Sequence, residues 1–207
     1  MISLFQLKPR PQERTCLIGT TGSGKTTMAR WLLNYYPYVV IFDPKDEIRW
    51  EGYKRFTTLR DLAGAKEPKL IYAPIASELR DEDFHEAFFR WIYERKNTLL
   101  YVDEVYAIAY RQDIPDSYHA CLTRGRTRNI SVISATQRPK DIHPVILSEN
   151  ENFFIYRLQL SQDKEAIRKT IGLDEDLISK LKKREFYHWT IDGANGPFKL
   201  HLNGDKK

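Results

Sequence analysis

Short apolar runs alternate along this chain with stretches in which apolar residues recur every three or four positions. Such runs are typical of buried strands, and the recurring positions are typical of amphipathic helices. The pattern predicts strands at 15–18, 38–42, 69–73, 99–102, 130–135 and 153–158, and helices near 27–35, 81–96, 115–123, 163–171 and 174–184. Strands and helices that alternate in this way indicate an α/β fold with a mostly parallel central sheet flanked by helices.

Two parts of the chain depart from this alternation. The polar residues that follow the strand at 38–42, through Arg55, are expected to form a loop. Near the end of the chain, Phe186–Ile191 and Phe198–Leu202 flank the turn-forming segment Asp192–Gly196, which predicts a C-terminal β-hairpin. No repeat or linker interrupts the 207 residues, so we expect a single domain spanning 1–207.

The segment Gly19–Thr26 matches every fixed position of a phosphate-binding P-loop and lies between a predicted strand and a predicted helix. Its glycines allow backbone N–H groups to converge on phosphate oxygens, and the helix adds its positive N-terminal end. Lys25 would reach the outer phosphates of ATP, and the Thr26 hydroxyl would bind Mg²⁺. The candidate nucleotide-binding residues are Gly19, Thr20, Thr21, Gly22, Ser23, Gly24, Lys25, Thr26 and Thr27.

Two adjacent carboxylates, Asp103 and Glu104, follow the apolar run Leu99–Val102. Open α/β sheets bind ligands at the carboxyl ends of their strands. Asp103 suits the magnesium shell, and Glu104 could orient the water that attacks the outermost phosphate. Acidic residues after strands are common on solvated surfaces, but their combination with a P-loop favours a catalytic pair.

Gln137 follows the apolar run that ends near Ala135. Its amide can both donate and accept hydrogen bonds, so it could register the outermost phosphate and relay its presence to neighbouring loops. A turn glutamine shortly before Pro139 explains the residue equally well, and the residue type alone does not separate the two interpretations.

Basic residues outnumber acidic ones by 33 to 28, which gives a formal net charge of +5. Contact with a polyanion is compatible with this excess, but the excess is too small to indicate one by itself. No apolar run is long enough for a transmembrane segment, so we expect a soluble protein.

Taken together, the segments Gly19–Thr26, Leu99–Glu104 and Ala135–Pro139 resemble the FtsK-HerA superfamily of DNA-pumping ATPases. Asp43-Pro44-Lys45 and the terminal hairpin are also similar to features of that superfamily. Within it, the short chain is similar to the genome-packaging ATPases of turreted icosahedral archaeal viruses. The resemblance implies a RecA-like P-loop NTPase fold and ATP hydrolysis coupled to the threading of double-stranded DNA through a pentameric or hexameric homo-oligomeric ring.

The resemblance also implies partners and a location. The ring would meet capsid or inner-membrane vertex proteins, in the host cytoplasm during assembly or at a packaging vertex of the virion. It further implies an arginine finger, which one subunit donates to the nucleotide of its neighbour. Arg126 is the closest match in position and Arg124 the second, although this basic run could also be a solvated face or touch DNA phosphates.

Other functions remain open from the residues alone. A cellular or plasmid DNA pump of the same superfamily would usually carry extra domains. A small-molecule phosphotransferase shares the P-loop and the size, but it would need an acceptor pocket, whereas Glu104 and Gln137 favour water as the acceptor. A nucleotide-controlled scaffold would not need Glu104. For DNA contact, the stretches 50–55 and 182–184 are candidates.

Overall fold

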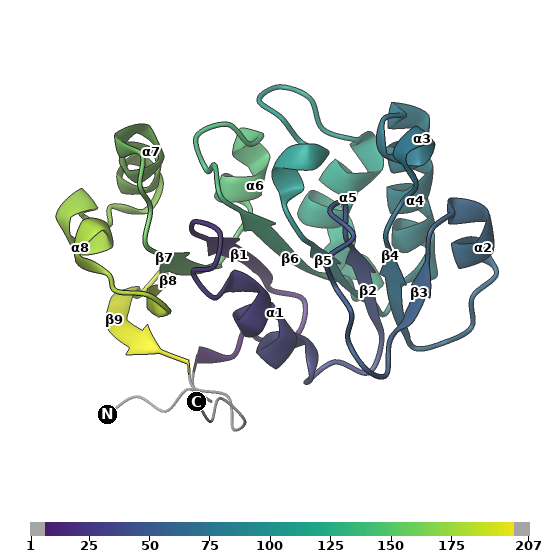
Figure 1. Cartoon of the computed structure of the whole chain (residues 1–207), viewed down its shortest axis with the longest axis horizontal. Helices are drawn as coiled ribbons and strands as arrows, with labels where there is room; N and C mark the ends of the chain where they lie inside the picture. Colours follow the sequence, from purple (N-terminus) through teal and green to yellow (C-terminus); the bar gives the residue numbers. More distant parts are fainter. Residues whose placement is uncertain (1–6, 201–207) are drawn as a thin grey trace.

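The computed structural model describes residues 7–200. Nine strands form one sheet in the order β3-β4-β2-β5-β6-β1-β7-β8-β9 (Figure 1). The strands are β1 (Arg14–Ile18), β2 (Val39–Phe42), β3 (Lys54–Phe56), β4 (Lys69–Tyr72), β5 (Leu99–Val102), β6 (Ser131–Thr136), β7 (Asn152–Tyr156), β8 (Glu185–Thr190) and β9 (Gly193–Lys199). All neighbours from β3 to β7 pair in parallel, and β8 and β9 are joined on by antiparallel pairing. The predicted mostly parallel sheet with a C-terminal hairpin is therefore confirmed.

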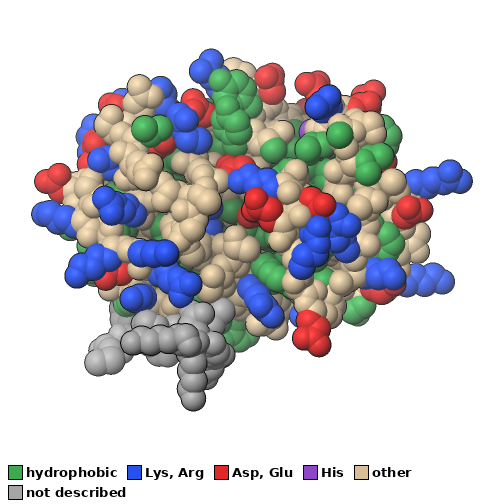
Figure 2. All heavy atoms as spheres, in the orientation of Figure 1, with side chains coloured by type: hydrophobic (Ala, Val, Ile, Leu, Met, Phe, Trp, Pro, Cys, Tyr) green, Lys and Arg blue, Asp and Glu red, His purple; other side chains and the backbone are tan. Residues whose placement is uncertain are grey.

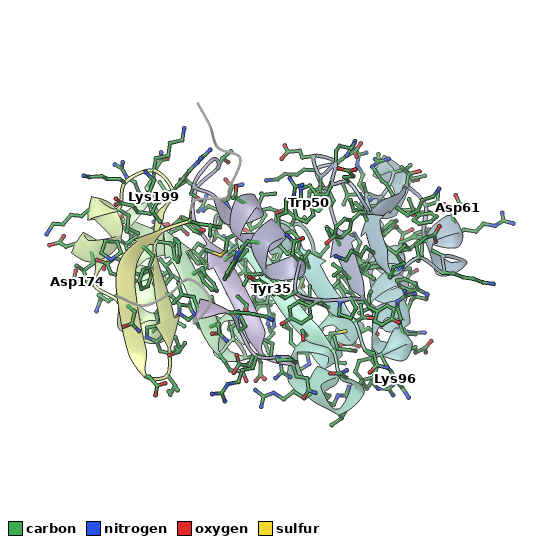
Figure 3. The ribbon with its side chains drawn as sticks, turned by 90° about the horizontal axis from the view of Figure 1, so that it is seen from below. Tyr35, Trp50, Asp61, Lys96, Asp174 and Lys199 are labelled. Carbon is green, nitrogen blue, oxygen red and sulfur yellow. The ribbon has the colours of Figure 1, made fainter. Side chains whose placement is uncertain are left out.

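Helices and short helical turns connect most of the strands. The helices are α1 (Lys25–Leu33), α2 (Leu59–Ala63), α3 (Ala76–Leu79), α4 (Glu82–Arg95), α5 (Asp116–Arg124), α6 (Pro144–Ser148), α7 (Ser161–Ile171) and α8 (Glu175–Lys180), with 3₁₀ turns η2 (Val105–Ala107) and η3 (Gly125–Arg128). In Figure 3, Asp61 of α2 lies near one end of the molecule, and Asp174, just before α8, lies near the other end. Among residues 7–200 no helix combines the length and the apolar character needed to cross a bilayer.

The central strands are buried on both faces, which explains why they read as continuous apolar runs. Successive side chains point to opposite faces, so each strand contributes to two separate cores. Leu17 and Ile41 join Leu32 of α1 in one core. Cys16, Ile18 and Phe42 face the other core, which is covered by buried side chains of α2, α4, α5, α6, α7 and α8.

The parallel register brings the loops of several strands to one edge of the sheet. Ile18, the last residue of β1, pairs with Thr136 of β6, and Val102 of β5 pairs with Ser134 of β6. Phe42 of β2 pairs with Val102. The residues that follow β1, β2, β5 and β6 therefore all lie at the carboxyl edge, where α/β sheets bind ligands.

Three predicted boundaries are wrong. The expected loop through Arg55 contains the start of β3, an edge strand with half-exposed side chains and hence no apolar run. The expected helix at 174–184 ends at Lys180, because Lys182 and Glu185 close a turn in which the Lys182 N–H donates to the Glu185 carboxylate at 2.8 Å.

The third correction concerns the hairpin turn. Only Ile191 and Asp192 separate the two strands, because β9 begins at Gly193, within the segment expected to be the turn. Trp189 pairs with Ala194 and Thr190 with Gly193, so backbone pairing rather than side-chain burial holds this end of β9. A strand of that kind leaves no apolar pattern to detect. Leu202, the expected end of the hairpin, lies outside the described residues.

Candidate active site

The P-loop joins β1 to α1 at the carboxyl edge of the sheet. Gly22 and Gly24 have positive φ angles of 71° and 115°, which glycine adopts without strain. At Gly19 a side chain has no room, because a Cβ there would lie 2.5 Å from Tyr156 Cβ and 2.8 Å from Ser23 Oγ. The buried Lys25 ammonium donates to the carbonyls of Gly19, at 2.7 Å, and Thr20, at 3.1 Å, and so closes the loop.

Gly19→Ala is expected to destabilise the protein by about 1–3 kcal/mol, because overpacking forces the P-loop away from β7. Urea unfolding would measure the loss. Gly64→Ala is the matched control, since a Cβ at Gly64 meets nothing closer than the Asp61 carbonyl at 3.8 Å. Equal stabilities of the two variants would show that the P-loop tolerates the clash.

Asp103 follows β5 and is buried, and the Tyr101 hydroxyl donates to its Oδ1 at 2.5 Å. Burial raises the pKa of Asp103, and the negative charge of Asp43 raises it further, while the Tyr101 hydrogen bond lowers it. Asp43, which follows β2, is 0% exposed. Its Oδ2 accepts the Ile48 N–H at 2.7 Å, whereas its Oδ1 is buried with no hydrogen-bond partner.

These carboxylates form the acidic part of the site. Burial and the negative charge of Asp43 raise the pKa of Asp103, so a nearby cation would stabilise its charged form. Carboxylate and hydroxyl oxygens are ligands that Mg²⁺ prefers. Thr26 adds an exposed hydroxyl in the first turn of α1. The donor chemistry of Asp103, Asp43 and Thr26 therefore fits a hard divalent cation held partly by substrate phosphates.

Glu104 is the most heavily bonded acid at this edge. Its Oε1 accepts from the Thr136 hydroxyl at 3.3 Å and from the Gln137 backbone N–H at 3.2 Å. Its Oε2 accepts from the Gln137 side chain at 2.8 Å and from the Lys45 ammonium at 3.4 Å. The backbone of Glu104 lies in the left-handed region, at φ 66° and ψ 69°. Such strain persists only where surrounding contacts hold it, and four donors do so here.

Gln137 connects this acid to the P-loop. While its amide nitrogen donates to Glu104, its Oε1 accepts from the Thr21 hydroxyl at 2.7 Å. Both contacts are possible because β6 lies between β1 and β5 in the sheet. The structure thus brings together the P-loop, Asp103, Glu104 and Gln137, all of which the sequence pattern selected.

Several residues of this edge were not selected from the sequence. The pattern placed Lys45 in a motif but assigned it no contact, and it did not identify Asp43, Tyr101 or Thr136 as neighbours of the acids. For Asp43, the position directly after an apolar strand was an available signal, and Lys45 follows two residues later. The contact of Thr136 with Glu104 depends on β5 and β6 being adjacent, whereas Tyr101 reaches Asp103 from two residues earlier in the same segment.

The structure does not bring the two candidate arginines to the P-loop of the same chain. Arg124 ends α5 and Arg126 lies in η3, and both precede β6, which follows them in the chain. The 6 residues of β6 span about 20 Å, so these arginines lie near the amino edge, opposite the P-loop. Arg126 forms an ion pair with Glu151, whose carboxylate also accepts the Arg14 backbone N–H at 2.7 Å.

Comparison with protein families gives a match over most of the chain. A model of the ATPase family associated with various cellular activities (AAA) matches residues 15–158. The DNA packaging ATPase P9 of Enterobacteria phage PRD1 is 27% identical over 172 residues, which cover 80% of this chain and 73% of the phage protein.

Solved structures show the same fold. The genome packaging NTPase B204 of Sulfolobus turreted icosahedral virus 2, in complex with AMPPCP, has a TM-score of 0.79 at 18% identity, covering 93% of this chain and 100% of that chain. VirB4 of Thermoanaerobacter pseudethanolicus has a TM-score of 0.72 at 13% identity, covering 92% of this chain and 90% of that chain. These matches confirm the predicted P-loop ATPase fold and the predicted resemblance to viral packaging ATPases.

Proposed function

Because this chain belongs to the ATPase family associated with various cellular activities (AAA), we propose that it is an ATP-driven translocase of double-stranded DNA that packages a viral genome into a preformed capsid. The names of two similar proteins, the PRD1 DNA packaging ATPase and the B204 genome packaging NTPase, support this role. The observation that carries the proposal is the direct link from Thr21 through Gln137 to Glu104. Such a link suits a water-using motor, because it joins the phosphate loop to the acid that would position water.

In this proposal the residues Gly19–Thr27 bind ATP. Backbone N–H groups of the loop hold the phosphates, and the Lys25 ammonium exchanges the carbonyls of Gly19 and Thr20 for phosphate oxygens. Asp103 and Thr26 would hold Mg²⁺, which neutralises charge on the phosphates when bound. The buried Asp43, whose Oδ1 has no hydrogen-bond partner, adds negative charge on the Asp103 side.

Glu104 orients the attacking water in line with the outermost phosphate and accepts its proton. A carboxylate that already accepts four hydrogen bonds must release one of them to accept a bond from water, and the bond to Gln137 connects that release to the P-loop. Gln137 therefore acts as the sensor that transmits the presence of the outermost phosphate to the loop after β6.

The catalytic site is completed by an arginine of a neighbouring subunit, with Arg126 as the first candidate and Arg124 as the second. Since both lie near the opposite edge from their own P-loop, they are suited to act between subunits. A guanidinium fork can contact several phosphate oxygens and stabilise charge in the transition state. A contact from one surface to a different surface of the next subunit builds a ring when the rotation between subunits closes.

The substrate of the motor is the DNA phosphate backbone, since packaging must accept every sequence. Figure 2 shows Lys and Arg side chains spread over one face among acidic ones rather than gathered in one patch. We assign the DNA grip to lysines and arginines that several subunits of the ring present together. Capsid or inner-membrane vertex proteins would be the docking partners, and the host cytoplasm during assembly would be the location.

ATP affinity is expected to fall as the pH rises above about 8. Burial lowers the pKa of Lys25 to about 8, although Glu104 and Asp103 raise it. Bound phosphates favour the charged ammonium, so between pH 8 and 10 binding must take up a proton, and affinity should fall by up to about tenfold per pH unit. Calorimetry at pH 9 in buffers of different ionisation enthalpy would count the proton. Lys25→Arg, which keeps its charge, should show no such uptake.

Displacement of a triplex-forming strand from double-stranded DNA, followed together with ATP hydrolysis, tests the proposed function. Wild type should displace the strand only with ATP, and DNA should raise the hydrolysis rate in a salt-dependent way. Glu104→Gln should bind ATP but leave the triplex intact. Hydrolysis indifferent to DNA and to protein concentration would reject the translocase and favour the small-molecule phosphotransferase.

A further inference from the structure

The basic turn between α8 and β8 lies against the P-loop, although Arg184 lies 160 positions after Gly24 in the chain. A Cβ placed on Gly24 would lie 3.8 Å from Arg184 Cγ and 3.3 Å from Tyr156 Cε1. Gly24 therefore sits in a corner between the last residue of β7 and this turn. The sequence pattern had grouped Arg184 with possible DNA contacts.

The two sides of the P-loop differ in chemistry. The Gly19 N–H donates to the Thr136 carbonyl of β6 at 3.1 Å, and the Thr20 N–H donates to the Arg157 carbonyl after β7 at 3.2 Å. Asp103, Glu104 and Gln137 follow β5 and β6, so they all lie on the first side. No carboxylate of that set lies on the β7 side.

This asymmetry sets the direction of a bound nucleotide, on the basis of the function proposed above. Hydrolysis requires the outermost phosphate to face Glu104 and its water. The phosphate chain must then run through the P-loop away from β5 and β6, so the nucleoside leaves the loop on the side of β7 and β8. Arg184 is a cationic residue whose side chain approaches Gly24 on that side.

The backbone that carries Arg184 is held firmly. The Lys182 N–H donates to the Glu185 side chain at 2.8 Å, and the Glu185 N–H donates to the Lys182 carbonyl at 3.0 Å. Immediately after this turn, the buried Phe186 packs on Tyr156 with ring centroids 5.4 Å apart. The turn is thereby fixed to β7 beside the P-loop, while the Arg184 side chain itself is exposed.

We propose that Arg184 binds the nucleoside end of the nucleotide, with its guanidinium stacked on the base. The phosphates already have the loop N–H groups and Lys25 as partners, whereas a planar guanidinium is suited to the face of a purine.

Calorimetric titration with Mg-ATP and with inorganic tripolyphosphate separates contact with the nucleoside from contact with the phosphates. Arg184→Ala should weaken ATP binding by about 3- to 30-fold and leave tripolyphosphate binding unchanged. Arg184→Lys, which keeps the charge without the planar group, should recover only part of the loss. Lys183→Ala, an exposed cation in the same turn, is the matched control and should bind both ligands as wild type does.

Two results would overturn the inference: unchanged ATP binding by Arg184→Ala, or equal loss of ATP and tripolyphosphate, which would indicate contact with the phosphates. Thermal unfolding of each variant verifies that it is folded, and Arg184→Lys keeps the test valid if the alanine variant is not. If wild type binds neither ligand, the proposed nucleotide function itself fails, which is a different outcome from failure of the Arg184 contact alone.

Discussion

Glu104→Gln is expected to slow ATP hydrolysis by about 10²–10⁴-fold while ATP binding stays close to that of wild type. Glutamine has nearly the same shape, and its oxygen still accepts from the Thr136 hydroxyl and the Gln137 backbone N–H, while its NH2 group replaces the Oε2 that accepts from the Gln137 side chain and Lys45. It cannot take a proton from water, so the loss should appear in kcat and not in affinity. Steady-state hydrolysis and equilibrium ATP binding, measured on the same preparation, would give both values.

The control for this variant is Glu47→Gln, which removes an exposed carboxylate from the loop after β2 at the same edge of the sheet. It should hydrolyse ATP at the wild-type rate. If Glu104→Gln loses affinity and rate together, Glu104 has a structural role in the P-loop region. If it keeps nearly full kcat, another group positions the water.

Arg126→Ala is expected to lower kcat by about 10³-fold or more, because an arginine finger stabilises transition-state charge to that extent. ATP binding by isolated subunits should stay unchanged, since Arg126 lies near the edge opposite its own P-loop. Loss of the ion pair with Glu151 should not unfold the region, because Glu151 still accepts the Arg14 N–H at 2.7 Å. Hydrolysis measured against protein concentration should rise steeply for wild type and stay low for the variant.

Mixing two inactive variants tests whether the arginine acts between subunits. Arg126→Ala keeps Glu104, and Glu104→Gln keeps Arg126, so a mixed ring contains some interfaces with both groups intact. The mixture should regain part of the wild-type activity, whereas either variant alone should not. Arg60→Ala, an exposed arginine of α2, is the control. If Arg126→Ala hydrolyses ATP at the full rate and Arg124→Ala loses hydrolysis, Arg124 is the arginine finger.

Local features of the sequence determined most of the fold class and of the candidate site. A P-loop is a contiguous motif, and its phosphate-binding geometry follows from glycines, a helix N-terminus and Lys25 within eight positions of one another. Asp103, Glu104 and Gln137 could be selected because polar residues directly after buried strands must lie at the carboxyl edge of a parallel sheet. The half-exposed β3 and the polar start of β9 could not be predicted in this way, since backbone pairing with neighbouring strands leaves no hydrophobic pattern.

Only the tertiary structure decided how these residues meet. The strand order β2-β5-β6-β1-β7-β8 places Gln137 between Thr21 and Glu104 and brings Lys45 within 3.4 Å of Glu104. The same order sets Arg184 beside Gly24 from the other end of the chain. Strand order depends on how distant segments of the chain pack against shared helices. The sequence gives the spacing of residues along the chain, but it does not show which strands are adjacent in the sheet.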